Sequence, residues 1–213
     1  MPFIGVQPAT VPLTSSDITD GIITGAKIED NPTIAGNLTV SGTANVTGVT
    51  TLADNIVFSA SGKGVHLGVT SATASNLQDD YEEGTFSATF SASGATIGQS
   101  VDKGTYTKIG NLVNVNIYVQ CDGTVSLNSN ALSITGLPFT SVNTSQVIYY
   151  SSAGMRLVTM ASNYDNLMAY INNNDTSVQL FQHGKGQIPT ALPSSGLSNS
   201  SGQIFVQMFY FTS

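Results

Sequence analysis

The densest group of side chains that could do chemistry is a run of carboxylates, Asp79, Asp80, Glu82 and Glu83. Oxygen clusters of this kind can hold Ca²⁺. Tyr81 interrupts the run, and carboxylates that flank a short helix are normally solvated, so the pattern favours a solvated group over a metal site. We predict neither a bound metal nor another cofactor.

Other reactive side chains are scattered. His66 and His183 are far apart in sequence and have no nearby Cys or Asp with which to form a triad. Cys121 stands alone within an apolar stretch, which indicates a small buried side chain rather than a nucleophile. The Gly-Lys-Gly triplets at 62–64 and 184–186 are too short for phosphate loops and indicate turns. We therefore expect no enzymatic activity.

Binding is the remaining kind of chemistry, and polar turns in the C-terminal part of the chain could bind a ligand such as a sugar. Amides and carboxylates bond sugar hydroxyls, while an aromatic ring covers the apolar face of a pyranose. The alternative is that these are ordinary solvated turns. The receptor-binding candidates are Asn143, Tyr164, Asn173, Asp175 and Asn199.

The elements that would present such turns begin with a six-residue repeat. Gly36, Gly42 and Gly48 follow the same step two residues after three of its apolar members. This period fits neither a helix nor a simple strand, and it is typical of β-solenoids and fibrous β-shafts. The apolar positions are Ile22, Ile28, Ile34, Val40, Val46, Leu52 and Phe58.

The repeat is too short to stabilise itself in one chain. It provides about two coils, whereas a solenoid buries a core only over about three or more repeats. Three chains that each send one apolar residue per hexapeptide to a common axis would bury these side chains. The sequence therefore predicts an intertwined β-shaft in a homotrimer.

The composition excludes several partners. Only 9% of the residues are charged, and six Lys and Arg against 13 Asp and Glu give a net charge of −7. Nucleic-acid binding needs clustered basic side chains, so we expect no nucleic acid partner. No apolar run reaches the roughly 18 residues of a membrane span, so we expect no membrane insertion.

Four regions follow along an all-β chain. Residues 1–20 form an extended arm whose apolar Phe3, Ile4 and Val6 favour docking on another protein over folding back on the shaft. Residues 21–61 form the shaft. Residues 62–84 form a collar, with a short helix predicted from Ser75 and Gln78 as a capping box through Asp79 and Asp80 to a stop at Gly84.

Residues 85–213 form the head, which we predict to be a β-sandwich or jelly roll. A Gly-Asn turn within 109–112 predicts a hairpin over 105–120 with Val113, Val115, Ile117 and Val119 on one buried face. Further strands are predicted at 131–134, 146–150, 156–161, 166–172 and 177–182. Residues 203–211 are apolar on both faces, which indicates a central strand that packs on the core and on neighbouring subunits.

Two stretches carry a resemblance to a known class of protein. GKGVHLGVTSATASNLQDDYEEGTFSATF at 62–90, followed by YTKIGNLVNV at 106–115, resembles the stalk-to-head junction of structural proteins from tailed bacteriophages, especially marine ones. MPFIGVQPA at 1–9 resembles the arm that opens many phage fibre proteins. The resemblance implies a trimeric tail fibre or related virion appendage, assembled in the cytoplasm of a bacterial host.

Two functions stay open from the sequence. The favoured one is a tail fibre whose head binds a host surface glycan or protein, with the arm attached to other virion proteins. The alternative is a structural adaptor or capsid decoration protein without a receptor-binding role.

Overall fold

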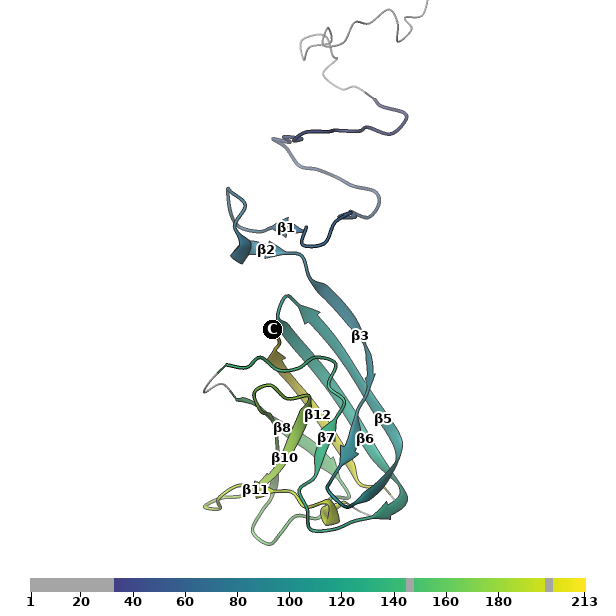
Figure 1. The fold of residues 1–213 in the computed structure, drawn as a ribbon, viewed down its shortest axis with the longest axis vertical. Helices are drawn as coiled ribbons and strands as arrows, with labels where there is room; N and C mark the ends of the chain where they lie inside the picture. The colour runs from purple at the N-terminus through teal and green to yellow at the C-terminus, as the bar shows by residue number, and fades with distance from the viewer. Residues whose placement is uncertain (1–32, 145–147, 198–200) are drawn as a thin grey trace, which may run out of the picture. The chain divides into compact units, whose positions relative to one another are not determined.

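The structure is a computed structural model that describes residues 33–144, 148–197 and 201–213 (Figure 1). The described residues are all-β, as predicted, and contain two short 3-10 turns and no α-helix. The chain divides into two compact units, Met1–Asn55 and Ile56–Ser213.

Residues 33–64 form neither helix nor strand. The apolar members of the repeat are exposed here to between 47% and 60% in a single chain. Those that the structure describes are Ile34, Val40, Val46, Leu52 and Phe58. Ile22 and Ile28 lie outside the described residues, as do Phe3, Ile4 and Val6 of the arm. The shared shaft stays a prediction.

The collar is built from a small hairpin rather than a helix. Strand β1 (Val65–His66) pairs with β2 (Leu77–Gln78), and between them lies the 3-10 turn η3 (Ala74–Asn76). The predicted helix through Asp79 to Gly84 is wrong, because Tyr81–Ser87 forms strand β3, which pairs with β5 over its whole length. Pairing with a distant strand outweighs a capping pattern worth about 1 kcal/mol.

The remaining strands belong to one sheet, in the order β3-β5-β6-β12-β8-β9-β10-β7-β4, with β11 paired to β10. Their bounds are β4 Thr89–Ser91, β5 Thr96–Ile109, β6 Leu112–Ser126, β7 Ser133–Thr135, β8 Tyr149–Arg156, β9 Asn166–Ile171, β10 Ser177–His183, β11 Thr190–Ala191 and β12 Gln203–Phe211. A second 3-10 turn, η4, spans Ser194–Gly196.

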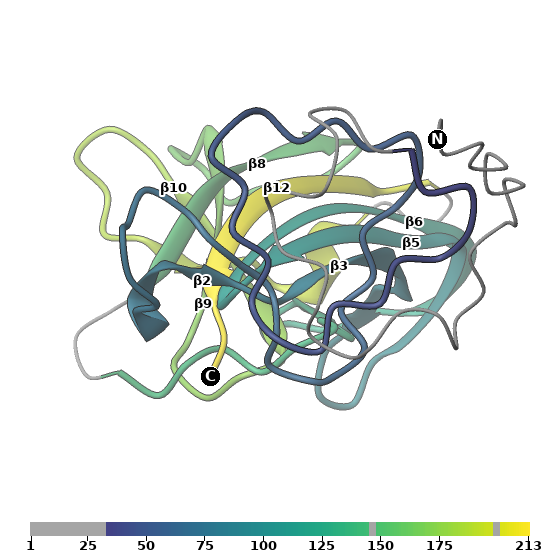
Figure 2. The same cartoon turned by 90° about the horizontal axis from the view of Figure 1, so that it is seen from above.

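This sheet curls into a nearly closed barrel. The edge strands β3 and β4 are consecutive in the chain and are separated only by Ala88, whose N–H donates to the carbonyl O of Asp102 on β5 (3.1 Å). Figure 2 shows β3, β5, β6, β12 and β8 side by side in one curved wall. The predicted β-sandwich is thus replaced by one continuous sheet, since the chain itself joins its two edges.

The predicted hairpin is confirmed. Ile109 pairs with Leu112 across the turn, and Gly110 takes the left-handed φ of 58° that favours glycine. The Gly110 N–H donates to the carbonyl O of Asp80 (2.8 Å), so this turn marks the end of the barrel next to the collar. We call it the collar end and the opposite end the far end.

Every second side chain along the strands points inward, and these side chains fill the barrel. The inward side chains of β6 and β12 form the middle of the core, and those of β9 and β10 close it from the other side. All are buried: Val113, Val115, Ile117, Val119, Cys121, Leu167, Ala169, Ile171, Val178, Leu180, Ile204, Val206, Met208 and Tyr210. The C-terminal strand is central, between β6 and β8, as predicted.

Within the described ranges, no helix has the length and apolar character needed to cross a membrane.

Candidate functional site

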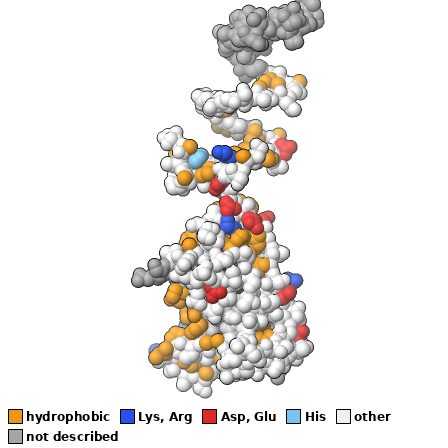
Figure 3. Space-filling model, viewed as in Figure 1, with side chains coloured by type: hydrophobic (Ala, Val, Ile, Leu, Met, Phe, Trp, Pro, Cys, Tyr) orange, Lys and Arg blue, Asp and Glu red, His pale blue; other side chains and the backbone are white. Residues whose placement is uncertain are grey.

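The carboxylate run is divided by strand alternation. Tyr81 and Glu83 lie on the outer face of β3, where the Tyr81 hydroxyl donates to Glu83 (2.9 Å). Glu82 lies on the inner side and accepts a hydrogen bond from the hydroxyl of Tyr106, whose pKa that bond raises. Figure 3 shows acidic side chains gathered where the head begins. Because they face opposite ways, these carboxylates do not converge on one point.

Asp80 has a different partner. It accepts a hydrogen bond from Lys108, a residue that is 9% exposed and whose Nζ lies 5.6 Å from the centre of the Phe139 ring. The Tyr106 ring meets Phe139 edge-on at 5.3 Å. The Asp80 and Lys108 pair ties the residue just before β3 to β5 at the collar end. Among the described residues, no three His, Cys, Asp or Glu side chains are grouped so as to hold a metal ion.

The remaining reactive side chains stay apart. The His66 Nδ1 lies 3.1 Å from the carbonyl O of Thr73 in the collar, whereas His183 ends β10 at the far end of the barrel. Cys121 points into the core, and burial raises the pKa of its thiol to about 11. This is the expected small buried side chain.

Three receptor-binding candidates, Asn143, Asn173 and Asp175, come together at the collar end. The side-chain amide of Asn173 donates to the carbonyl O of Thr144, and the Asp175 N–H donates to the Ser141 Oγ (3.0 Å). Of the three, Asn143 is exposed and the other two are half-buried. Sequence reasoning did not predict that these loops share the end of the barrel next to the collar.

Asp175 is already used within the protein. Its Oδ1 accepts hydrogen bonds from the N–H (2.9 Å) and the hydroxyl (2.7 Å) of Ser177. The carboxylate therefore holds the turn between β9 and β10, where Asn174 has a positive φ of 55°. The Asn173 Oδ1 is buried and accepts no hydrogen bond from the described residues.

Tyr164 lies at the far end. Its hydroxyl donates to the carbonyl O of Ile188 (3.0 Å), and the six residues of β9 separate it from the Asn173 loop. The structure thus divides the predicted recognition set between the two ends of the barrel. Asn199 lies outside the described residues.

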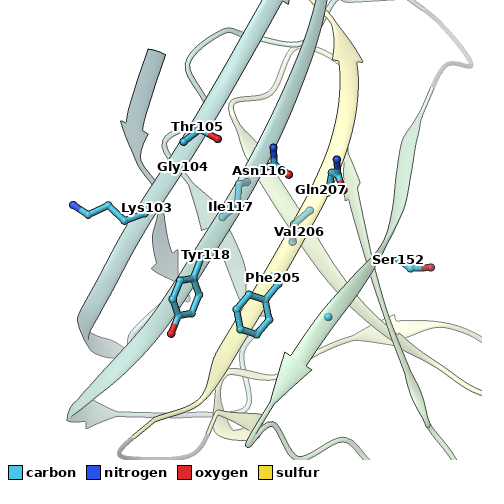
Figure 4. Close-up of a pocket in the computed structure, with 11 residues that line it drawn as sticks. Lys103, Gly104, Thr105, Asn116, Ile117, Tyr118, Ser152, Phe205, Val206 and Gln207 are labelled. Carbon is cyan, nitrogen blue, oxygen red and sulfur yellow. The ribbon is translucent and has the colours of Figure 1, made fainter. Parts of the chain in front are cut away.

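An open groove lies on the outer face of the barrel, and sequence reasoning missed it. It has a volume of about 520 Å³ and crosses β5, β6, β12 and β8 (Figure 4). We call it the outer groove. It is lined by Lys103, Gly104, Thr105, Asn116, Ile117, Tyr118, Ser152, Gly154, Phe205, Val206 and Gln207.

Two aromatic rings lie side by side in the outer groove. Tyr118 and Phe205 pair across β6 and β12 and stack with 4.7 Å between ring centroids and 17° between planes. Gly154 pairs with Phe205 from β8 and leaves the space beside the ring open. The two-residue alternation along each strand could have predicted that both rings face outward. It could not have predicted that β6 and β12 are paired.

Polar side chains continue the groove toward the collar end. Asn116 and Gln207 are directly opposite each other on β6 and β12, and Figure 4 shows both above the aromatic pair. Both are exposed, and their amide groups make no hydrogen bond to other described residues. The groove has an aromatic surface and amide groups. Its lining residues include no acid, base or nucleophile that contacts another such group.

Comparison with known proteins gives one informative likeness. No protein-family model and no curated protein matches the chain. The fold is similar to the crystal structure of the Dettilon tailspike protein, with a TM-score of 0.52 and 21% identity over 62% of this chain. The match spans 24% of the length of that protein. At this identity the likeness concerns the fold.

Proposed function

We propose that the protein is a homotrimeric appendage of a tailed bacteriophage virion, a tail fibre or a related protein, whose head binds a molecule on the host surface. The observation that carries the proposal is the barrel fold, which is similar to that of a tailspike protein. The collar and hairpin motifs at 62–90 and 106–115 support the same class. The proposed role is binding without catalysis.

The exposed repeat supports the trimer. The apolar members of the repeat from Ile34 to Phe58 are 47% to 60% exposed in a single chain, a pattern that marks a surface buried by another protein. Winding three copies together would cover them. The arm, with Phe3, Ile4 and Val6, would then attach the trimer to another virion protein.

The far end of the barrel is the proposed host-facing end. A head that follows its shaft presents the end opposite the collar, and loops at that end are free of core constraints. Tyr164 is the sequence-predicted candidate found there, and the neighbouring turn exposes Lys185 and Gln187. Asn143, Asn173 and Asp175 belong to the collar end and fit contacts within the appendage better.

Cell binding tests this role. Fluorescently labelled protein is mixed with a panel of cultured marine bacteria, and Tyr164→Ala, Lys185→Ala and Gln187→Ala are compared with the collar-end control Asn143→Ala. We expect adsorption to at least one strain, reduced several-fold by far-end variants and unchanged by the control. Wild-type protein that adsorbs to no strain on which its phage grows would contradict a receptor-binding role.

The alternative is an adaptor or capsid decoration protein. The observation that favours it is the internal bonding of Asn173 and Asp175, which engages two of the predicted recognition side chains within the protein. Deleting residues 2–18 tests attachment in either case. We expect a folded trimer that no longer joins particles, and normal incorporation of the truncated protein would contradict the docking arm.

A further inference from the structure

Outward side chains of β3, β5, β6 and β12 form regular rows across the barrel wall. The row nearest the collar consists of Tyr81, Ile109, Leu112 and Phe211, each directly opposite the next in the strand pairing. All four are at least 37% exposed. One complete row of the outer face is therefore apolar, on a wall whose inner face already packs on the core.

A second apolar line runs along β12 at right angles to this row. The outward positions of β12 are Phe205, Gln207, Phe209 and Phe211, so three of the four are phenylalanine, and Phe209 is 61% exposed. Tyr118 stacks on Phe205 at the far end of this line. Several exposed phenylalanines on one strand face are typical of protein interfaces.

The face is also uncharged where the two central strands run. Outward positions of β6 and β12 between Leu112 and Phe205 carry Asn, Gln, Tyr, Leu and Phe, while Glu83 and Lys103 stand on β3 and β5. In a chain of net charge −7, copies approach one another with least repulsion through a neutral face.

The size of the face indicates how strong its contact would be. Four strands about 4.8 Å apart and seven residues at about 3.4 Å each give a footprint of about 450 Å². Apolar patches of this size mark interaction sites on many proteins. A stable interface buries about 800 Å² per partner, so this face would assist an association that another segment drives.

We propose that the outer face of β6 and β12, centred on Phe209, faces the three-fold axis of the homotrimer and packs on the same face of the other two copies. This inference rests on the proposed trimeric appendage and adds which surface of the head the copies share. The shaft supplies the association, and joining the copies there raises the effective concentration of the heads. In three-fold symmetry, a residue at the axis lies beside its own equivalents.

Site-specific cross-linking tests the assignment on the full-length protein. Phe209→Cys and Gln207→Cys place a thiol on the proposed face. Gln179→Cys places one on the outer side of β10, which two strands separate from β12. Each variant is treated with a short bismaleimide and run on a denaturing gel, while sedimentation of the untreated protein gives its oligomeric state. Wild-type protein, with its buried Cys121, supplies the background.

We expect all variants to sediment as trimers and the Phe209→Cys and Gln207→Cys proteins to give covalent dimers. One reagent joins two of three equivalent thiols, so up to about two thirds of the chains can be linked. Gln179→Cys should remain at background. A trimer in which neither β12 variant cross-links would overturn the assignment of the face while leaving the trimeric appendage intact. A monomeric wild-type protein would overturn both.

Discussion

The rings of Tyr118 and Phe205 stack face to face across two neighbouring strands, with 4.7 Å between their centroids. Both side chains point away from the core, and the pair borders the outer groove. An outward pair of this geometry on rigid strands fixes the shape of the wall that we infer to meet other copies.

A double-mutant cycle measures this pair. Tyr118→Leu and Phe205→Leu should show a coupling free energy of about 0.5 to 1.5 kcal/mol in urea unfolding at one fixed protein concentration. Tyr81→Leu combined with Phe205→Leu is the control, because β5 and β6 lie between their strands. That control should be additive within about 0.5 kcal/mol. Additivity in the Tyr118 and Phe205 cycle would mean that the stacked geometry contributes no stability.

The Lys108 and Asp80 pair should stabilise the collar end. Asp80→Ala leaves the buried ammonium without its carboxylate and should lower the free energy of unfolding by about 1 to 3 kcal/mol. Adding Lys108→Met should recover most of this loss, since a methionine of similar length fills the space beside Phe139 without charge. Urea denaturation of the three proteins checks both steps. A double variant less stable than Asp80→Ala would contradict the pairing.

Alkaline pH should destabilise the barrel through Tyr210. Burial raises the pKa of its hydroxyl to about 12, and that hydroxyl donates to the carbonyl O of Phe139 (2.9 Å). The unfolded chain loses this proton near pH 10, so between pH 10 and 12 it binds fewer protons than the folded chain, and stability falls by about 2 to 3 kcal/mol. Cys121 adds a similar dependence from about pH 9 to 11.

Tyr210→Phe separates the two contributions. It should be less stable at pH 8, where the hydrogen bond is lost, and its free energy of unfolding should fall less steeply above pH 10. Chemical unfolding at pH 8, 10 and 11 gives both values. An unchanged slope above pH 10 would show that Tyr210 ionises alike in both states.

The Cys121 thiol should be protected by folding. A raised pKa and full burial leave almost no accessible thiolate at pH 8. We expect no reaction with a chromogenic disulfide reagent in the native protein. In concentrated urea, which unfolds the chain, the reaction should be complete. Lys185→Cys, at an exposed position in the turn after β10, provides the positive control. Rapid labelling of native wild-type protein would contradict the buried placement.

Shaft variants test the predicted six-residue repeat. Val46→Asp would bring three carboxylates together near the axis without partners, whereas Thr39→Asp adds the same charge on a position outside the repeat. We expect sedimentation to show loss of the trimer for Val46→Asp and a normal trimer for Thr39→Asp. Equal assembly of both variants would mean that the repeat does not mark a shared core.

Part of the fold follows from the sequence alone. The turn at Gly110 and the alternation from Val113 to Val119 are local signals, and the structure contains that hairpin. The C-terminal strand begins and ends where its apolar run does, at Gln203 and Phe211. These features depend on turn chemistry and on a two-residue period, which neighbouring residues specify without help from distant parts of the chain.

Long-range pairing decided what local signals could not. Tyr81–Ser87 becomes a strand because β5 pairs with it, although a capping pattern precedes it. The predicted strand at 156–161 does not form, since β8 ends at Arg156 and Leu157 turns the backbone with a positive φ of 54°. Closure of the barrel likewise depends on β3 and β4 lying at opposite edges of one sheet.

The candidate site shows the same division. The sequence by itself determined which side chains are polar and in turns, and which strand is apolar on both faces. Only the tertiary structure decided that Asn173 and Tyr164 lie at opposite ends of the barrel and that Tyr118 meets Phe205. The physical reason is that residue type and spacing fix local conformation, whereas strand order and register depend on contacts between residues far apart in the chain.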